Sequence, residues 1–228
     1  MNPSRDFSSN IPLLALVGAN TVPLWGVLFA GWDAFLLVLL YWAENVIVGF
    51  YNILRIATAK TEHIAEQLGK LFMIPFFVVH YGGFTAVHGL FVLFLFQKGE
   101  GARAFPAARE WPCFFAFVQL LINVIKEAFA VAPESFRVAF SGLMVSHGVS
   151  FVYNYLLKGE YANATGKDLM ARPYGRIVVM HIAVLAGAFL TMAVGSPVAI
   201  LTVLVVLKTF VDVQLHLREH KKMKAKRA

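Results

Sequence analysis

The chain has 228 residues, of which 59% are hydrophobic and only 14% charged, whereas soluble domains are about 45–50% apolar and about 25% charged. A chain of this size cannot bury so much apolar surface in one aqueous core. Six of its 20 Lys and Arg lie in residues 218–228, a basic tail that suits anionic lipid and requires no nucleic acid. The composition excludes an ordinary soluble domain and predicts an all-α integral membrane helical bundle.

Apolar runs long enough to cross a bilayer, about 20 residues each, predict about seven transmembrane helices in a single domain over residues 1–228. The predicted spans lie near 11–30, 33–56, 71–96, 111–131, 135–157, 174–194 and 197–217, followed by the basic tail 218–228. The fourth is the weakest, because Lys126 and Glu127 lie near its end. Six spans with a re-entrant segment are the alternative.

Basic residues divide unequally between the two sides of such a bundle. The side of the N-terminus carries 6 Lys and Arg and the opposite side 13, while Lys208 lies within the last span. Because positively charged flanks stay in the cytoplasm, the sequence predicts an N-terminus outside and a C-terminus in the cytoplasm. Arg172 and Arg176 are assigned to the cytoplasmic flank, with the binding of an anionic headgroup as an alternative.

Polar side chains recur within the apolar spans. Ionisable groups at mid-span cost at least about 2.5–3.5 kcal/mol each, so they normally face the bundle interior and mark a functional site. In the second span one helical face carries Tyr41, Glu44, Asn45, Asn52 and Arg55. The later spans carry further polar groups, among them His80, His88, His147, His181, Lys208, Asp212 and His216.

Five of these residues form a set of potential metal ligands. Imidazole nitrogens and carboxylate oxygens are ligands of zinc and iron. We therefore predict a divalent transition metal, zinc or iron, held by His88, His147 and His181, with Glu44 and Asp212 as further ligands or as a catalytic base. Such a metal would activate water against a lipid-like substrate, although the sequence does not settle whether the protein is an enzyme. Haem is the less favoured cofactor.

Three other interpretations use the same polar residues. Chains of Glu, Asp and His are the usual material of proton paths, so the first is a proton- or ion-coupled transporter. The second is a structural network of interhelical hydrogen bonds in which Glu44 pairs with a histidine. The third is a helper subunit of a larger membrane complex. The lipid bilayer is the expected partner, and a homo-oligomer is left open.

One segment of the second span resembles a known family. The run Tyr41-Trp42-Ala43-Glu44-Asn45, followed by Gly49, Asn52 and Arg55, resembles the signature of an uncharacterised bacterial family of polytopic inner-membrane proteins, a domain of unknown function. The His147 segment, Arg172-Pro173-Tyr174-Gly175 with His181, and the Lys208, Asp212 and His216 span are similar to the same family. The resemblance implies a location in the bacterial inner membrane and implies no activity.

Overall fold

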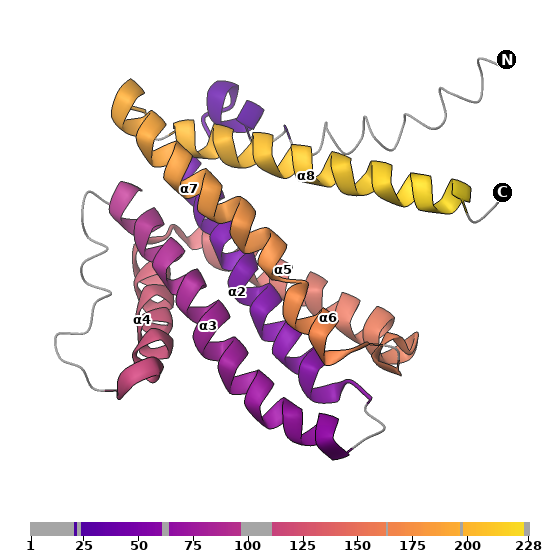
Figure 1. Ribbon diagram of the computed structural model, residues 1–228. Helices are drawn as coiled ribbons and strands as arrows, with labels where there is room; N and C mark the ends of the chain where they lie inside the picture. The colour runs from indigo at the N-terminus through magenta and orange to yellow at the C-terminus, as the bar shows by residue number, and fades with distance from the viewer. Residues whose placement is uncertain are drawn as a thin grey trace, which may run out of the picture. The chain divides into compact units, whose positions relative to one another are not determined.

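The structure is a computed structural model that describes residues 21, 24–60, 64–96, 111–162, 164–196 and 198–225. Within these ranges it contains helices and no strand (Figure 1), which confirms the predicted all-α class. The chain divides into two units, one of residues Phe35–His181 and one of Met1–Ala34 with Ile182–Ala228. The α-helices are α2 (Ala34–Thr58), α3 (Ile64–Phe96), α4 (Ala116–Val131), α5 (Glu134–Ser150), α6 (Gly166–Ala171), α7 (Tyr174–Val194) and α8 (Val198–Ala225).

Among the described residues, three helical stretches are long and apolar enough to cross a membrane: Ala34–Thr58, Ile64–Phe96 and Gly166–Leu190. A shorter apolar stretch, Val198–Val211, lies in α8. The seven predicted spans are therefore not all confirmed. Most of the first, 11–30, lies outside the described residues. The fourth is reduced to α4, whose 16 residues extend about 24 Å, less than the roughly 30 Å of a bilayer core.

Helices α2 and α3 pack closely because glycines meet aromatic rings at their interface. The Trp42 side chain is buried, and its indole N–H donates to the Thr85 carbonyl at 2.7 Å. A Cβ atom on Gly89 would lie only 2.4 Å from the Trp42 ring, and one on Gly49 only 2.6 Å from the Tyr81 ring. Both glycines thus permit a backbone approach that a larger residue would prevent.

Helix α5 continues into a π-helical segment, η3 (Phe151–Leu157). Its wider turn ends where the Lys158 N–H donates to the carbonyl of Tyr153, five residues earlier, at 3.0 Å. The segment turns Tyr155 fully inward, and the Tyr155 hydroxyl donates to the Arg55 carbonyl of α2 at 2.8 Å. This contact joins α2 to the helix that carries His147.

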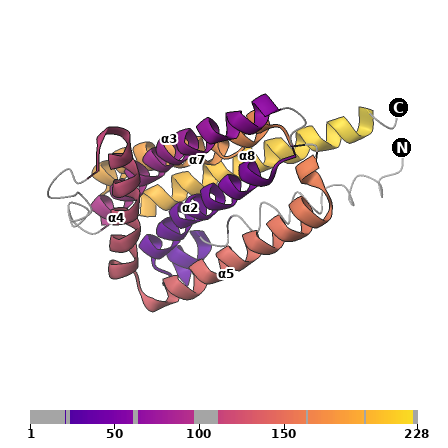
Figure 2. The same ribbon diagram turned by 90° about the horizontal axis from the view of Figure 1, so that it is seen from below.

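The contacts fix the directions of the helices within the unit Phe35–His181. Glu44 contacts His147 and Arg55 contacts Tyr155, so α2 and α5 run in the same direction. The seven-span prediction requires those two helices to run in opposite directions. The backbone N–H of Lys60 also donates to the Tyr161 carbonyl at 3.0 Å, so the turn after α2 and the segment after η3 share one end of the unit. Figure 2 shows α4 steeply inclined to α2 and α5.

The second unit contains the last part of α7 and the helix α8. The turn between them contains Gly195, whose φ of 72° lies in the left-handed region that glycine tolerates. Gly187 faces Ile200, where a Cβ atom would lie 2.5 Å from the Ile200 Cα. The backbone of the basic tail continues α8 as far as Ala225, while the side chains of that tail lie outside the described residues.

Candidate functional site

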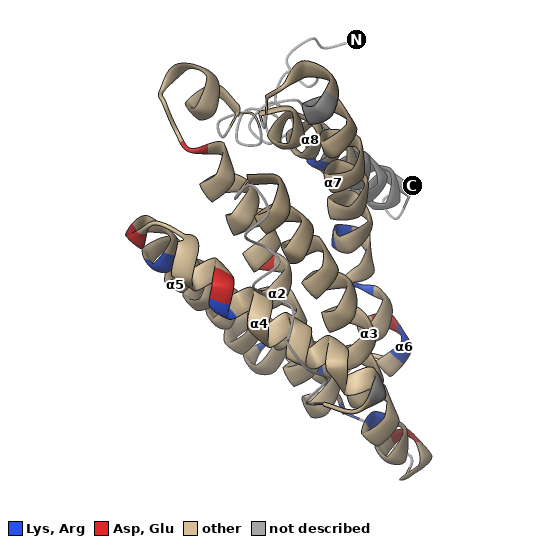
Figure 3. Ribbon diagram, turned by 90° about the vertical axis from the view of Figure 1, so that its left-hand side faces the viewer, with Lys and Arg blue, Asp and Glu red and all other residues tan. Residues whose placement is uncertain are grey.

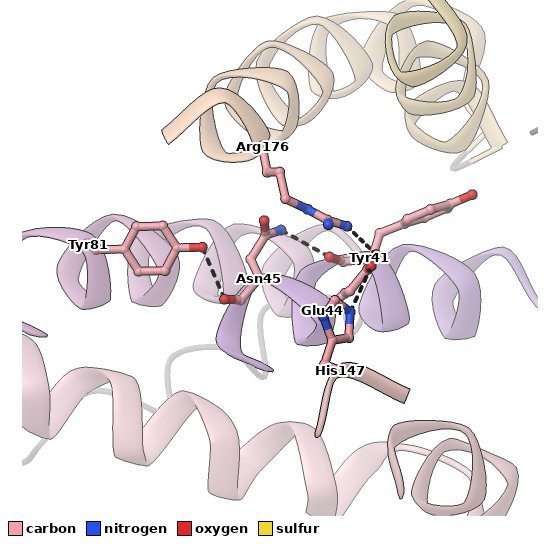
Figure 4. Close-up of polar contacts among 6 residues, drawn as sticks. All are labelled: Tyr41, Glu44, Asn45, Tyr81, His147 and Arg176. Atoms are coloured by element: carbon pink, nitrogen blue, oxygen red, sulfur yellow. Dashed lines mark hydrogen bonds and ion pairs between the residues drawn. The ribbon is translucent and has the colours of Figure 1, made fainter. Parts of the chain in front are cut away.

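Glu44 contacts one residue from each of two other helices, His147 of α5 and Arg176 of α7. Its Oε1 atom lies 3.3 Å from Nε2 of His147, and its Oε2 atom lies 2.5 Å from an Nη atom of Arg176. Figure 4 shows the two partners approaching the carboxylate from different helices. The Glu44 side chain is 18% exposed, that of His147 25% and that of Arg176 41%. The carboxylate is thus the most enclosed member, and the guanidinium is the most accessible.

Hydrogen bonds and ring contacts hold the neighbouring residues in place. The Asn45 side-chain amide donates to the Tyr41 carbonyl at 3.0 Å, and the Tyr81 hydroxyl of α3 donates to the Asn45 carbonyl at 3.1 Å (Figure 4). The Tyr51 ring stacks on the His147 imidazole, with ring centroids 6.4 Å apart. Its hydroxyl donates to the Met144 carbonyl at 2.9 Å. Tyr51 therefore fixes α5 against α2 beside the histidine.

The ion pair lies at mid-length of two helices that could cross a membrane. Glu44 is the eleventh of 25 residues in Ala34–Thr58, and Arg176 is the eleventh of 25 in Gly166–Leu190. Figure 3 shows how few charged residues interrupt the apolar length of these helices. Charges in such surroundings are rare, pair with one another and mark functional sites. The predicted span 174–194 coincides with α7, but the apolar helical stretch also includes α6, so Arg176 lies further from the end of that stretch than from the end of the predicted span.

Further along α2, the polar face continues into the interior of the unit. The Asn52 amide donates to the Leu169 carbonyl at 2.9 Å, with 1% of the residue exposed. The side-chain oxygens of Asn45 and Asn52 and the Nε atom of Arg55 are buried without a hydrogen-bond partner among the described residues. The one-face arrangement expected for this span is confirmed for Glu44, Asn45 and Asn52.

Two further predicted residues, His88 and His181, form a separate pair. Nε2 of His88 lies 2.9 Å from Nδ1 of His181, and Nδ1 of His88 lies 2.6 Å from the Phe84 carbonyl oxygen. Since a carbonyl only accepts, His88 carries a proton on Nδ1. In a neutral pair, His88 Nε2 must then accept from His181 Nδ1–H, which leaves Nε2 of His181 as an acceptor.

The comparisons with known proteins decide the family. The family of unknown function DUF6498 matches residues 2–228. The chain belongs to this family. No curated protein and no solved structure matches it. The resemblance to an uncharacterised family is thus confirmed, and membership of DUF6498 assigns no activity, so the function must be argued from the site itself.

The five residues predicted as one metal site in this DUF6498 member do not assemble among the described residues. Glu44 and His147 form one group and His88 and His181 another, while the side chain of Asp212 lies outside the described residues. In the part of the chain that the structure describes, no group of three or more His, Cys, Asp or Glu is placed to hold a metal. The zinc or iron site, and the haem alternative, therefore gain no support from the geometry.

Sequence reasoning missed Arg176 as the partner of Glu44. It anticipated the histidine partner, because the structural interpretation paired Glu44 with a histidine. Arg176 was assigned to the cytoplasmic flank, with the binding of an anionic headgroup as the alternative. The apolar residues Leu169, Met170 and Ala171 before Pro173 are the signal that the helical stretch begins earlier and that Arg176 lies deeper.

Proposed function

We propose that this protein is an integral membrane protein that couples the binding of a proton at Glu44 to the binding of an anion at Arg176 and His147, as a proton-coupled transporter does. The observation that supports the proposal is the Glu44 carboxylate held between Arg176 and His147 at mid-length of two apolar helices. This proposal develops the interpretation of the polar residues as part of a proton- or ion-coupled transporter, and it requires no metal.

The balance of charge between Glu44 and Arg176 couples proton binding to anion binding. An arginine side chain stays charged at any physiological pH, and a lone charge in an apolar environment is costly. Deprotonated Glu44 compensates Arg176. Protonation of Glu44 removes that compensation, so Arg176, with His147 beside it, then favours an incoming carboxylate or phosphate. Proton and anion therefore bind together, because each makes the other more favourable.

The exposure of the three side chains supports the joint binding of a proton and an anion. Arg176 is the most exposed of them, and its planar guanidinium can bind a carboxylate or a phosphate through two hydrogen bonds. His147 of α5 and Arg176 of α7 contact the carboxylate from packed helices, and the Tyr81 hydroxyl of α3 contacts the adjacent Asn45 backbone. An anion can thus reach the guanidinium while Glu44 stays enclosed.

The helix directions also favour a specific membrane topology. Because α2 and α5 are parallel, we infer one crossing between them, that of α3, with α4 as the re-entrant segment of the six-span alternative. The turn at Lys60 and the segment at Tyr161 then face the same side. If the predicted spans 11–30 and 197–217 also cross, the N-terminus and the basic tail face that same side, which the positive-inside rule assigns to the cytoplasm.

The experiment is a panel of acetate, formate and sulfate, whose own charges change little between the two pH values, added to the detergent-purified protein at pH 5.5 and at pH 7.5. We expect at least one anion to raise the Tm of the wild type more at the lower pH, because protonated Glu44 has released Arg176. Glu44→Gln should bind that anion equally at both pH values, and Arg176→Gln should lose the effect.

Matched controls are Glu134→Gln and Arg137→Gln, which change an exposed carboxylate and an exposed guanidinium near the start of α5. Both should respond as the wild type does. The proposal fails if no anion in the panel stabilises the wild type. It also fails if Glu44→Gln keeps the pH dependence of the wild type.

A further inference from the structure

A groove separate from Glu44 runs along α3 and is lined by η2 (Cys113–Phe115), α4 and α7. Its volume is about 760 Å³, within the range of about 300–1,000 Å³ that is typical of small-molecule sites. Six phenylalanines line it: Phe72, Phe76, Phe84, Phe114, Phe115 and Phe117. The polar side chains in the lining are three histidines, His80, His88 and His181. An apolar groove with few polar groups matches a ligand with an apolar body and a small polar part.

The histidines bring polar atoms to a depth where the membrane offers no water. His80 is the seventeenth of 33 residues in Ile64–Phe96, and His181 is the sixteenth of 25 in Gly166–Leu190. Both side chains are exposed on the unit, in contrast to His88, which is 3% exposed. An exposed imidazole in hydrocarbon leaves a hydrogen-bonding nitrogen unsatisfied, which costs free energy. A ligand that forms a hydrogen bond with this nitrogen removes that free-energy cost.

The bonds within the pair define what the ligand must offer. Nδ1 of His88 donates to the Phe84 carbonyl, so in the neutral pair Nδ1–H of His181 donates to His88. Nε2 of His181 is then an acceptor and requires a hydroxyl or N–H donor. His80 is held differently, through its Nδ1 atom against the Tyr174 hydroxyl at 2.7 Å. Nε2 of His181 therefore favours a ligand that carries a hydroxyl or N–H donor.

We propose that this groove binds a membrane-soluble molecule with a hydroxylated ring, the chemistry of an isoprenoid quinol, with the ring hydroxyl donating to Nε2 of His181. A planar ring packs favourably against the phenylalanines. A fatty acid is disfavoured, because it would bring a carboxylate charge to mid-membrane depth. The groove shares no residue with the Glu44, His147 and Arg176 group, so this proposal and the anion-binding proposal stand or fall separately.

The test uses decylubiquinol as the probe, with decylubiquinone and palmitate as comparators, and the full chain in lipid nanodiscs. Binding is measured as a saturable rise in Tm with probe concentration. We expect decylubiquinol to bind about fivefold or more tightly than decylubiquinone, because the quinone has no donor for His181 and a neutral hydrogen bond contributes about 1 kcal/mol. Palmitate should bind more weakly than either.

Two substitutions probe the groove itself. His181→Phe keeps an aromatic ring and removes the acceptor, so decylubiquinol should bind about fivefold more weakly and no better than decylubiquinone. Val87→Trp fills the groove and should abolish saturation. The matched control is Val178→Trp, at an exposed position of α7 outside the lining, which should leave binding unchanged.

The proposal is overturned if decylubiquinol shows no saturable effect, or if palmitate binds as tightly, which would make the groove a general acyl-chain surface. Equal binding of quinol and quinone by the wild type would also overturn it, because His181 would then not select a donor. If Val87→Trp binds decylubiquinol as tightly as Val178→Trp does, the ligand binds outside the groove.

Discussion

The Glu44 carboxylate contacts two residues that belong to other helices. His147 and Arg176 lie on α5 and α7, and each contacts a different carboxylate oxygen. Removal of the carboxylate leaves Arg176 charged without a partner, whereas removal of the guanidinium leaves a negative charge beside His147. In apolar surroundings both changes cost more than the pair itself contributes.

A double-mutant cycle measures how far the contribution of Glu44 to stability depends on Arg176. Glu44→Gln and Arg176→Gln should each lower the free energy of unfolding by about 1–2 kcal/mol, a value kept modest because Arg176 is partly exposed. The double variant should be clearly more stable than the sum of the two losses predicts. The measurement is denaturation in mixed micelles. Strict additivity would mean that the two side chains do not stabilise each other.

Residue-level predictions from the sequence succeeded where helical periodicity alone decides the outcome. The polar face of the second span was predictable, since Glu44, Asn45 and Asn52 follow the helical repeat. The choice of partners was not, because periodicity says which side of a helix is polar but not which helix lies opposite. That is why residues from different helices were combined into one metal site, for which the described residues show no group of three or more ligands.

At the level of elements, α2 and α3 owe their close packing to two glycines. Gly89 faces the Trp42 indole and Gly49 faces the Tyr81 ring, both at distances that exclude a methyl group. The sequence could not identify Trp42 as the ring that Gly89 meets, since α2 and α3 could pair in several registers.

Alanine at either glycine should force the two helices apart. We expect Gly89→Ala and Gly49→Ala to cost about 1–3 kcal/mol of stability each, as overpacking typically does. Gly69→Ala in α3 and Gly142→Ala in α5 are the controls, since no atom would lie within 4 Å of the added methyl. The controls should be neutral or slightly stabilising in a helix. Thermal denaturation distinguishes the two groups, and equal Tm values for all four variants would refute the packing argument.

At the scale of the whole molecule, the direction of α5 determines the topology. Apolar length predicted a full fourth span over 111–131, but α4 has 16 residues and α5 runs parallel to α2. The sequence left six spans with a re-entrant segment as the alternative, and hydropathy cannot report helix direction, so the sequence alone could not decide between the two. Under the six-span topology proposed above, the orientation derived from the count of basic residues is reversed, because every side after the third span is exchanged.

Cysteine labelling tests the revised topology directly. Lys60→Cys and Glu160→Cys, each at an exposed position and each in a Cys113→Ala background, should react alike with a membrane-impermeant maleimide. Both should be protected in intact cells and labelled after the membrane is opened. Labelling of one and not the other in intact cells would support the seven-span arrangement instead.

The most direct test of the central claim counts the protons taken up when the anion identified in the panel binds. Calorimetric titration in buffers of different ionisation enthalpy gives this number. Between the two pH values of the panel, we predict an uptake that approaches about one proton per anion in the wild type and nearly none in Glu44→Gln, because the carboxylate is the group that takes up the proton. Anion binding with the same proton uptake in both proteins would contradict the account.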